Sequence, residues 1–465
     1  MVAWSINNQV RTPLLLMAVV EALIAYSSIY AAGLIWFGSL ELCEEVFGPL
    51  ALRATIITVV VVVSLIAMGL YQFHQRLSFG EAIVRIMVGL AASSLALAVI
   101  FYAFPSVMVS RELASVAVSY AFILLLVVRY LFVRTVDENV FRYNTLIYGA
   151  GKRAASIFDL RRRADRRGFK IVGRVAAPGD KIVGDMDLLE IDGEAINDLA
   201  ARLGADEIVV AMDNRRGNLP IRHLLDAKLN GIDVIDLLEF LERESGKIRV
   251  DLVNPGWLIF SSGFGKTRFR RVFKRVVDII VSAALLLLGW PLMLLIVLAI
   301  KHEDGVRAPV LYRQRRVGQG GNPFAVLKFR SMAVDAEADG EAIWADVDDS
   351  RNTRVGTFLR RFRLDELPQL VNVLRGQMSI VGPRPERPEF VKELQENIPY
   401  YSERHTVKPG ITGWAQIKYS YAASEADATE KLQYDLYYIK HHTMLLDLMI
   451  ILQTVEVVLW SKGAR

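Results

Sequence analysis

The feature that most constrains this chain is a series of four apolar segments in its N-terminal part. They comprise Leu14–Phe37, Ala54–Phe73, Ala82–Phe104 and Leu113–Phe132. Each is close to the length of about 20 residues that an α-helix needs to cross a bilayer. We therefore expect residues 1–143 to form a domain of four transmembrane helices.

The charges that flank these segments predict their orientation. The loop after the first segment is acidic, with Glu41, Glu44 and Glu45. The fourth segment ends among basic residues, which include Arg129 and Arg134. Because short basic loops stay in the cytoplasm, both ends of the helix bundle should lie there. The chain does not begin with a short apolar segment and a small-residue cleavage site, so we expect no removable signal peptide.

Two charges within or near the apolar segments need an explanation. Glu21 lies inside the first segment, and Arg85 lies near the start of the third. An ionisable side chain at membrane depth suggests a functional site by default. Two structural explanations are favoured here: a contact inside the helix bundle, or a side chain that reaches the membrane interface.

The composition excludes several classes of protein. Hydrophobic residues make up 53% of the 465 residues, which indicates a membrane protein with soluble domains. The net charge is +5, and the clustered basic residues favour anionic lipid headgroups or phosphate ligands over nucleic acid as partners. Cys43 is the single cysteine, which excludes an internal disulfide framework and a cysteine-based zinc site.

From residue 144 the pattern changes to alternating strand and helix signals. The expected strands are Thr145–Tyr148, Lys170–Val175, Glu207–Ala211 and Asp233–Asp236, and the expected helices are Gly193–Leu203 and Leu219–Asn230. Such alternation predicts a Rossmann-like, doubly wound α/β domain over residues 144–245. A linker over residues 246–267 is expected to follow it.

A glycine-rich turn, Gly149–Ala154, follows the first of these strands and has the pattern GxGxxA. A turn of this kind can hold a dinucleotide phosphate at the N-terminus of the next helix. However, the unit is short, and the second strand ends without a clear acidic residue. A degenerate, cofactor-free domain that regulates or dimerises is therefore at least as well supported.

The residues with the clearest chemistry lie in Arg360–Pro388. Asp365 and Glu366 are adjacent carboxylates that follow a group of three arginines, and Arg384 is enclosed by two prolines. Guanidinium groups suit phosphate oxygens, and a carboxylate pair suits a hard divalent cation that also carries phosphate. These residues predict a site for a phosphorylated substrate. The alternative for an isolated Asp-Glu pair is an ordinary helix N-terminus.

Four motifs occur in order in the C-terminal part: Lys328–Met332, Leu364–Gln369, Val381–Pro385 and Lys408–Gln416. On these motifs, residues 268–465 resemble the bacterial sugar transferase family, the monotopic polyprenyl-phosphate glycosyl-1-phosphate transferases. The four expected membrane helices and the α/β domain match, by layout, the long form of this family, which primes exopolysaccharide synthesis.

The resemblance implies a reaction. A phospho-sugar passes from a UDP-sugar to undecaprenyl phosphate, which releases UMP and yields a lipid diphosphosugar. Asp365 would be the nucleophile that forms a phospho-sugar intermediate, and Glu366 would bind Mg²⁺. Such an attack requires that magnesium and arginine offset the charge of the diphosphate. The expected location is the bacterial inner membrane, with the catalytic domain on the cytoplasmic face.

Four basic residues match the family and are expected to bind substrate phosphate: Arg360, Arg384, Lys328 and Arg330. Lys328 and Arg330 alternate with Phe329 along an expected strand, so both can face one anion. Three other arginines are expected at the surface or against lipid headgroups: Arg361, Arg363 and Arg387. The Lys408–Gln416 loop is expected to shape the nucleotide pocket, with Trp414 either packing or stacking.

A polybasic stretch, Arg268–Arg275, precedes a long apolar run, Val276–Ile300. The basic residues predict contact with anionic lipid headgroups. Pro291 lacks a backbone donor and kinks a helix, here in the middle of the run. A spanning helix would place the carboxylate pair outside, away from cytoplasmic nucleotide-sugars. We therefore predict a re-entrant helix–break–helix that enters and leaves on the cytoplasmic face. Asp278 near its entrance and residues 301–304 at its exit are compatible with both ends lying in water.

The remaining segments are expected to support this site. The expected elements are a hairpin of Val310–Gln314 and Phe324–Arg330, an acidic solvated helix at Ala333–Ala342, and amphipathic helices at Thr357–Arg363 and Leu367–Arg375. Met444–Trp460 is apolar but carries two acidic residues, which favours a packed or interfacial helix over a further span.

Two other functions compete with sugar-phosphate transfer. A catalytically inactive membrane scaffold, in which the α/β domain senses a nucleotide, is disfavoured by the intact Asp365 and Glu366. A multi-span phosphotransferase with its site among the membrane helices is disfavoured because those helices carry few acidic residues. The sugar is open among glucose, galactose and N-acetylated aminosugars, and the resemblance favours a neutral hexose. A homodimer is also expected.

Overall fold

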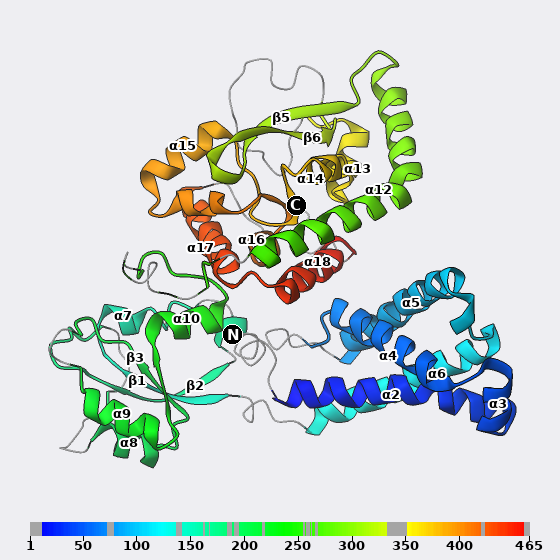
Figure 1. Ribbon diagram of the computed structural model, residues 1–465. Coiled ribbons are helices and arrows are strands. Elements are labelled where there is room, and N and C mark those ends of the chain that lie inside the picture. The colour runs from blue at the N-terminus through cyan, green and yellow to red at the C-terminus, as the bar shows by residue number, and fades with distance from the viewer. Residues whose placement is uncertain are drawn as a thin grey trace. The chain divides into compact units, whose positions relative to one another are not determined.

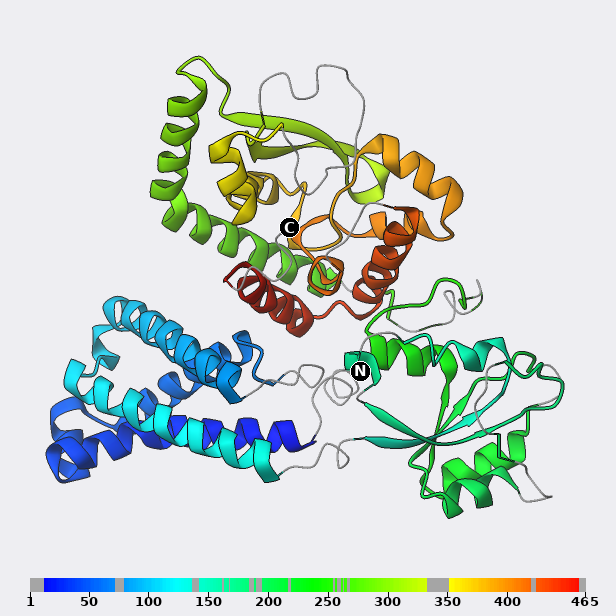
Figure 2. The same cartoon turned by 180° about the vertical axis from the view of Figure 1, so that it is seen from behind.

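The computed structural model describes residues 12–71, 79–135, 142–160, 163–166, 168–183, 188–189, 195–215, 219–253, 256, 261, 263–265, 268–332, 351–419 and 424–459. The chain forms two compact units, Met1–Ser245 and Gly246–Arg465. Figures 1 and 2 show the helices and strands of each unit from opposite sides.

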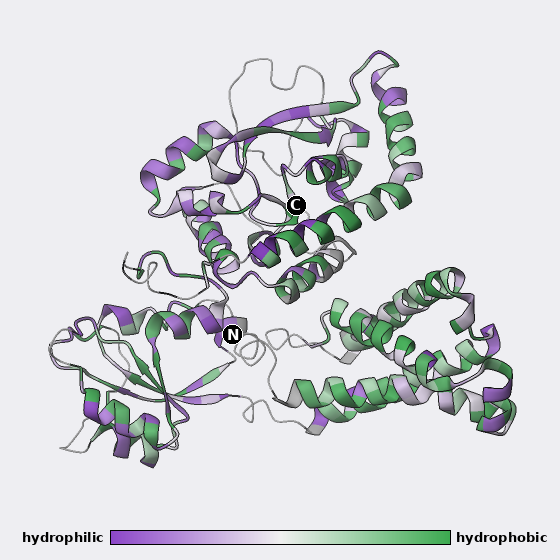
Figure 3. Cartoon of the chain, in the orientation of Figure 1, coloured by the Kyte–Doolittle hydropathy of each residue, from purple (hydrophilic) through white to green (hydrophobic). Residues whose placement is uncertain are grey.

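Four long helices form the apolar part of the first unit. They are α2 (Thr12–Phe37), α4 (Leu50–Ala67), α5 (Phe79–Ala103) and α6 (Arg111–Thr135). Each is long and apolar enough to cross a membrane, as predicted, and Figure 3 shows apolar residues along all four. Both α2 and α5 pack against α4 and α6. A short helix, α3 (Leu40–Phe47), and a 3-10 turn, η1 (Pro105–Val107), lie in the connections.

The two charges predicted at membrane depth are both buried among these helices. Glu21 is fully buried, and its Oε1 lies 2.7 Å from Nε of Arg129. Arg85 donates a hydrogen bond from Nη1 to the Met68 carbonyl at 2.7 Å, and Arg129 donates to the Leu70 carbonyl at 3.0 Å. Carbonyls near a helix end lack helical partners, so the two arginines satisfy the turn that follows α4. This result confirms a structural contact inside the bundle.

The rest of the first unit is an α/β domain with a four-stranded parallel sheet. Its strands are β1 (Tyr143–Tyr148), β2 (Phe169–Val175), β3 (Glu207–Val210) and β4 (Asp233–Asp236), in the order β2-β1-β3-β4. All four predicted strands form. The helical elements are α7 (Lys152–Ala155), η3 (Arg163–Arg166), α8 (Ile196–Arg202), α9 (Ile221–Leu229) and α10 (Leu237–Ser245). The two predicted helices correspond to α8 and α9, both shorter than expected.

The glycine-rich turn after β1 is closed by the chain's own side chains. Asp213 accepts hydrogen bonds from the backbone N–H groups of Lys152 (3.0 Å) and Arg153 (2.8 Å), the first residues of α7. A Cβ at Gly151 would clash with the Asp213 carboxylate. The amides that would hold a dinucleotide phosphate are therefore already used, which favours the cofactor-free alternative.

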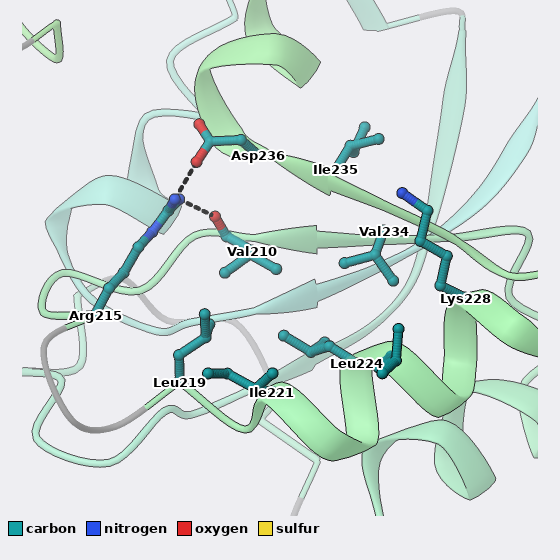
Figure 4. A pocket seen from close by; sticks show the side chains of 10 residues that line it. Val210, Arg215, Leu219, Ile221, Leu224, Lys228, Val234, Ile235 and Asp236 are labelled. Carbon is teal, nitrogen blue, oxygen red and sulfur yellow. Dashed lines mark hydrogen bonds and ion pairs between the residues drawn. The ribbon is translucent and has the colours of Figure 1, made fainter. Parts of the chain in front are cut away.

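A hollow lies elsewhere in this domain, between α9 and the ends of β3 and β4 (Figure 4). Its volume is about 300 Å³, and its wall is mainly apolar, with Leu224 and Val234 among its residues. Arg215 at the edge pairs with Asp236 and donates to the Val210 carbonyl at 2.9 Å. Arg215 and Asp236 thus neutralise one another, and the hollow contains none of the predicted site residues.

The second unit holds a mixed α/β domain. Its elements in chain order are α12 (Arg268–Asp304), β5 (Leu311–Val317), η4 (Gln319–Gly321), β6 (Pro323–Phe329), α13 (Arg354–Arg361), η5 (Leu364–Glu366), α14 (Gln369–Leu374), β7 (Ser379–Val381), α15 (Pro388–Asn397), η6 (Tyr401–Thr406), β8 (Gly410–Thr412), α16 (Trp414–Lys418), α17 (Glu425–His441) and α18 (Met444–Leu459). β5 and β6 form the predicted antiparallel hairpin, and β7 pairs with β8 in parallel. The acidic segment Ala333–Ala342 lies outside the described residues.

The last helix, α18, is packed into this domain, as predicted. Leu446 and Ile450 are buried in the main core together with residues of α14, β7 and α17. Asp447 lies 2.7 Å from Nζ of Lys274 on α12 and accepts a hydrogen bond from Tyr438 at 2.7 Å. These contacts tie the last helix to the start of α12.

α12 is one helix of 37 residues with Pro291 inside it. It is long and apolar enough to cross a membrane. Its two halves run in different directions in both views (Figures 1 and 2). Proline removes one helical hydrogen bond and commonly produces a sharp bend. The predicted helix–break–helix is therefore a bent helix that no loop interrupts.

Asp278, whose position was compatible with a helix end in water, is buried. Its residue is 4% exposed, and its carboxylate accepts hydrogen bonds from Ser379 Oγ (2.9 Å) and the Ile380 N–H (3.0 Å) of β7. A buried carboxylate is tolerated when such donors replace water. Val272 and Ile280 are instead exposed on α12. The first half of α12 is therefore anchored to β7 by a polar contact and presents apolar side chains elsewhere.

Candidate active site

Asp365 and Glu366 lie together in the 3-10 turn η5, between α13 and α14. The turn follows Arg363, which has a left-handed backbone conformation with φ 54°. This conformation is strained for a residue with a side chain, and such strain is common at functional sites. Both carboxylates are buried, and α14 begins only at Gln369. The pair is therefore not the exposed N-terminus of an ordinary helix.

Two predicted cations surround the carboxylate pair. Nζ of Lys328 on β6 lies 3.8 Å from Asp365 Oδ2 and 3.7 Å from Glu366 Oε1. Arg384 donates a hydrogen bond from Nη2 to Glu366 Oε1 at 2.9 Å. The Arg384 side chain is still 37% exposed, so its guanidinium can also contact a ligand. The fold thus joins three of the four family motifs in one site.

The two carboxylates have opposite electrostatic environments. Burial raises the pKa of Asp365 above its ordinary value, and Lys328 opposes that shift. Burial also acts on Glu366, but the charge of Arg384, the charge of Lys328 and the Arg384 hydrogen bond lower its pKa to about 2. Adjacent acids with pKa values moved apart are typical of catalytic sites, where each acid has a different role.

The other two predicted phosphate-binding residues, Arg360 and Arg330, differ in their relation to the carboxylate pair. Arg360 donates a hydrogen bond to Asn352 Oδ1. Its charge also lowers the pKa of Asp365, but this effect is smaller than those of burial and of the other charged residues around the carboxylate pair. Arg330 is buried and pairs with Asp304 at the end of α12. Lys328 and Arg330 therefore do not face one anion, because the end of α12 supplies Arg330 with its own carboxylate.

Arg363 belongs to the site, although a surface position was expected. It is partly buried between α13 and the carboxylate turn. Burial lowers the pKa of Arg363, the charge of Glu366 raises it, and the charge of Arg384 lowers it further. The arginines at positions 361 and 363 look alike in the sequence. Arg363 has a left-handed backbone conformation and is partly buried, whereas Arg361 ends α13 and is exposed.

Sequence reasoning missed two arginines that hold the segment around Arg384. Arg404 of η6 is buried and donates to the Arg384 carbonyl at 3.0 Å, and it also pairs with Asp435 at 2.8 Å. Arg316 of β5 donates to the Pro385 carbonyl at 3.2 Å. Neither arginine lies in a family motif that we used, and only the fold brings them to the segment. They fix the backbone from which Arg384 reaches Glu366.

Asn372 is a further residue that the sequence did not reveal. It is fully buried on α14, accepts a hydrogen bond from the Leu327 N–H at 3.0 Å and donates to the Ala325 carbonyl at 2.8 Å. A buried amide with both ends satisfied is a strong constraint on the elements that it joins. Asn372 therefore fixes strand β6, and with it Lys328, against the helix that follows the carboxylates.

Trp414 packs in the core and does not form an exposed stacking surface. It is 6% exposed, and its Nε1 donates to the Gly246 carbonyl at 2.8 Å. Its ring stacks on Tyr437, with ring centroids 5.9 Å apart. Of the two alternatives for Trp414, the structure supports packing.

The donor set fits a magnesium ion. Within the described residues, no group of three or more His, Cys, Asp or Glu side chains could hold a metal. Magnesium does not require one, because it is usually bound through one or two carboxylates together with substrate phosphates and water. The two adjacent carboxylates, one of them with a strongly lowered pKa, supply such oxygen ligands.

These features define a class: a membrane protein with a domain in which buried carboxylates and arginines form a site suited to phosphate. The model of the family described as bacterial sugar transferase matches residues 269–461. The chain belongs to the bacterial sugar transferase family.

Named relatives agree with the family match. The chain is 39% identical over 244 residues to the UDP-N-acetylgalactosamine-undecaprenyl-phosphate N-acetylgalactosaminephosphotransferase of Aeromonas hydrophila, which covers 52% of this chain and 56% of the relative. It is 39% identical over 311 residues to the UDP-glucose:undecaprenyl-phosphate glucose-1-phosphate transferase of Klebsiella pneumoniae, with 64% of each protein covered. A protein of the same name from Caulobacter vibrioides is 42% identical over 194 residues, which cover 41% of this chain and 71% of that protein. The chain thus spans less than two thirds of the length of the first two relatives.

Proposed function

We propose that this protein transfers a phospho-sugar from a UDP-sugar to undecaprenyl phosphate, which releases UMP and forms undecaprenyl-diphosphate-sugar. This reaction would be the first membrane step of exopolysaccharide or another surface glycan. The observation that carries the proposal is the buried Asp365–Glu366 pair with Lys328 and Arg384 within 3.8 Å of it. The names of the relatives, which contain both a UDP-sugar and undecaprenyl phosphate, support it.

Asp365 is the proposed nucleophile. Its carboxylate oxygen attacks the phosphorus that carries the sugar, the bond from this phosphorus to the bridging oxygen breaks, and UMP leaves with the electron pair. A phosphate oxygen of undecaprenyl phosphate then attacks the same phosphorus and displaces the Asp365 carboxylate. The raised pKa of Asp365, caused by burial, marks the more basic of the two acids.

The neighbouring residues offset the charge of the diphosphate. Arg384 and Lys328 supply positive charge in a site that is mostly closed to water, where such charge acts strongly. Glu366, which stays ionised, is the residue that would hold Mg²⁺. When bound, that ion would neutralise diphosphate oxygens as a Lewis acid. Arg360 and Arg363 add positive charge on the α13 side.

We expect Lys328→Met to move the acid limb of the pH–rate profile to higher pH. The reaction needs ionised Asp365, whose pKa is raised by burial and lowered by Lys328. Removal of Lys328 therefore raises that pKa further, and the rate begins to fall at a higher pH as the solution is acidified. The measurement is the initial rate of UMP release between about pH 5 and 9. An acid limb that stays in place or moves to lower pH would contradict the assignment of Asp365.

The membrane arrangement is also a proposal. We propose that the four N-terminal helices span the bacterial inner membrane and that α12 is re-entrant, with the catalytic domain on the cytoplasmic face. Two observations support this arrangement. The helix is bent and contains Pro291, and apolar side chains are exposed along it. A helix of this kind would hold the site at the depth of the lipid phosphate.

Cysteine labelling should place both ends of α12 on one membrane face. In a Cys43→Ser background, Phe269→Cys and Val306→Cys put exposed thiols at the two ends of the helix. A membrane-impermeant maleimide should label both from the cytoplasmic side. Glu45→Cys, in the connection between α2 and α4, is the control and should label from the other side. Labelling of positions 269 and 306 from opposite faces would show a spanning helix.

The direct test of the activity is UMP release from a panel of UDP-sugars, with undecaprenyl phosphate and Mg²⁺. The panel should contain UDP-glucose, UDP-galactose and the N-acetylated aminosugars, and we expect a neutral hexose to react best. UMP release that depends on the acceptor for continued turnover supports the proposal. An absence of release with every sugar would favour the alternative of an inactive scaffold.

A further inference from the structure

The last turn of α12 contacts two segments of the active site. Glu303 accepts hydrogen bonds from the backbone N–H groups of Arg354 (2.8 Å) and Val355 (3.0 Å), the first two residues of α13. The next residue of α12, Asp304, pairs with Arg330, which directly follows β6. The acidic end of α12 is therefore bound both to the start of α13 and to the end of β6.

α13 also contacts the chain after β6 directly. The Thr353 N–H donates a hydrogen bond to the Ser331 carbonyl at 3.1 Å. A Cβ at Gly356, in the first turn of α13, would lie 1.9 Å from the same carbonyl oxygen, so this close approach requires glycine. Each of the three elements, α12, β6 and α13, thus contacts the other two.

α13 depends on contacts at its N-terminus. It has only 8 residues, and helices of this length are marginal without contacts from outside. The first N–H groups of a helix have no partner within it. Glu303 accepts from two of them, and Thr353 Oγ1 accepts from a third, the Gly356 N–H, at 2.9 Å. Glu303 is itself exposed, so its contribution here is the cap and not the filling of a core.

A small apolar cluster packs α12 against the same part of the domain. Its members come from α12, β6, α13 and the two ends of the carboxylate turn: Ile296, Ile300, Phe329, Leu359, Leu364 and Leu367. The last four are direct sequence neighbours of Lys328, Arg360, Asp365 and Glu366, in that order. The backbone that carries these four site residues therefore packs against the second half of α12.

We infer that the last turn of α12 positions the active site and that Glu303 is a positioning residue for the reaction. Glu303 acts through α13, which leads directly into the turn that contains Asp365. Asp304 acts on β6 through Arg330. The inference rests on the proposed function, and it gives the membrane helix a part in the geometry of catalysis. A small displacement of a nucleophile lowers the rate of attack strongly, even where the substrate still binds.

The test measures UMP release and UMP binding by the full-length protein in lipid nanodiscs with Mg²⁺. Glu303→Ala should lower kcat about tenfold or more and change the Kd for UMP less than about threefold. Glu303→Gln keeps a side-chain oxygen that can accept from α13, and its kcat should stay within about threefold of the wild type. His302→Ala, at an exposed residue of the same turn, is the matched control and should behave like the wild type.

Hydrogen exchange follows α13 independently of activity. In Glu303→Ala the backbone amides of α13 should exchange about tenfold faster than in the wild type, because the helix opens more readily without its cap. His302→Ala should leave their exchange unchanged.

A double-mutant cycle tests the second contact of the turn. Asp304→Asn and Arg330→Gln each remove one partner of the pair, and the double variant removes both. If Arg330 acts through Asp304, the double variant should have a kcat no lower than that of the worse single variant. Losses that multiply in the double variant would overturn the role of Asp304 and would favour a contact between Arg330 and the substrate.

The outcomes at Glu303 decide the inference. If the wild type releases UMP and Glu303→Ala keeps its kcat within about threefold, the inference is wrong and the proposed function is unaffected. It is also wrong if kcat falls without faster exchange in α13, or if kcat and UMP binding are lost equally. If the wild type releases no UMP from any UDP-sugar, the proposed function and the inference fall together.

Discussion

Asp365→Asn should abolish UMP release, with a fall in kcat of at least about 10³-fold. Asparagine has nearly the same shape, but its amide oxygen is a poor nucleophile towards phosphorus. The variant should still fold, because burial raises the pKa of Asp365 and the folded protein therefore tolerates a neutral side chain there. The loss of activity would then report the chemistry and not a loss of structure.

The controls for this experiment are a second carboxylate and a binding measurement. Glu389→Gln removes an exposed carboxylate of α15, and its activity should equal that of the wild type. Asp365→Asn should keep the melting temperature and the UMP affinity of the wild type within a factor of about three. A variant with kcat within tenfold of the wild type would show that Asp365 is not the nucleophile.

Arg384→Met should lower kcat/KM for the UDP-sugar by about 10²–10³-fold, the usual effect when one charged donor is lost from a closed phosphate site. The substitution has two effects. It removes the guanidinium group that is proposed to contact the diphosphate. It also leaves Glu366 with one remaining ion pair among the described residues, the longer contact to Lys328 at 3.7 Å. Removal of one partner from a buried pair also destabilises the fold.

Two further variants, Arg384→Lys and Arg361→Met, separate the effect on phosphate binding from the effect on stability. Arg384→Lys keeps the charge beside Glu366 but cannot form the bidentate contact with phosphate. It should restore the melting temperature while kcat/KM stays at least tenfold low. Arg361→Met, at an exposed arginine of α13, should change neither quantity. Equal losses of activity in Arg361→Met and Arg384→Met would contradict a specific role of Arg384 in phosphate binding.

The strands, the hairpin and the helix bend, which depend on residues close together in the chain, could be predicted from the sequence. The four parallel strands of the α/β domain appear where short apolar runs lie between turn residues, and the hairpin of β5 and β6 forms around its glycines. The bend of α12 accompanies Pro291, whose effect on a helix is local. Such features depend on a few neighbouring residues, which the sequence contains in full.

Long-range polar contacts could not be predicted. Asp278 lies near the entrance of the predicted re-entrant helix, a position compatible with water exposure, but its partner Ser379 is 101 residues away. Arg330 has the same strand parity as Lys328, yet parity defines only a face of the strand and does not identify the nearest carboxylate on another element. In both cases the sequence identified a charge correctly, and the tertiary fold determined its partner.

The same limit applies within the candidate site. The motifs predicted that Asp365, Glu366, Lys328 and Arg384 act together, and the structure brings them together. Arg404 lies between two motifs in a segment of no particular pattern, so only its contact with the Arg384 carbonyl reveals it. Arg363 lies in a left-handed turn after the end of α13, and periodicity does not predict such a turn.

The central claim is a covalent intermediate on Asp365. The most direct measurement is to incubate the protein with a UDP-sugar labelled at the phosphate next to the sugar, without acceptor, and then to denature it. We predict that the wild type retains the label, loses it when undecaprenyl phosphate is added before denaturation, and that Asp365→Asn retains none. UMP release by a wild type that retains no label in the denatured protein would contradict the account.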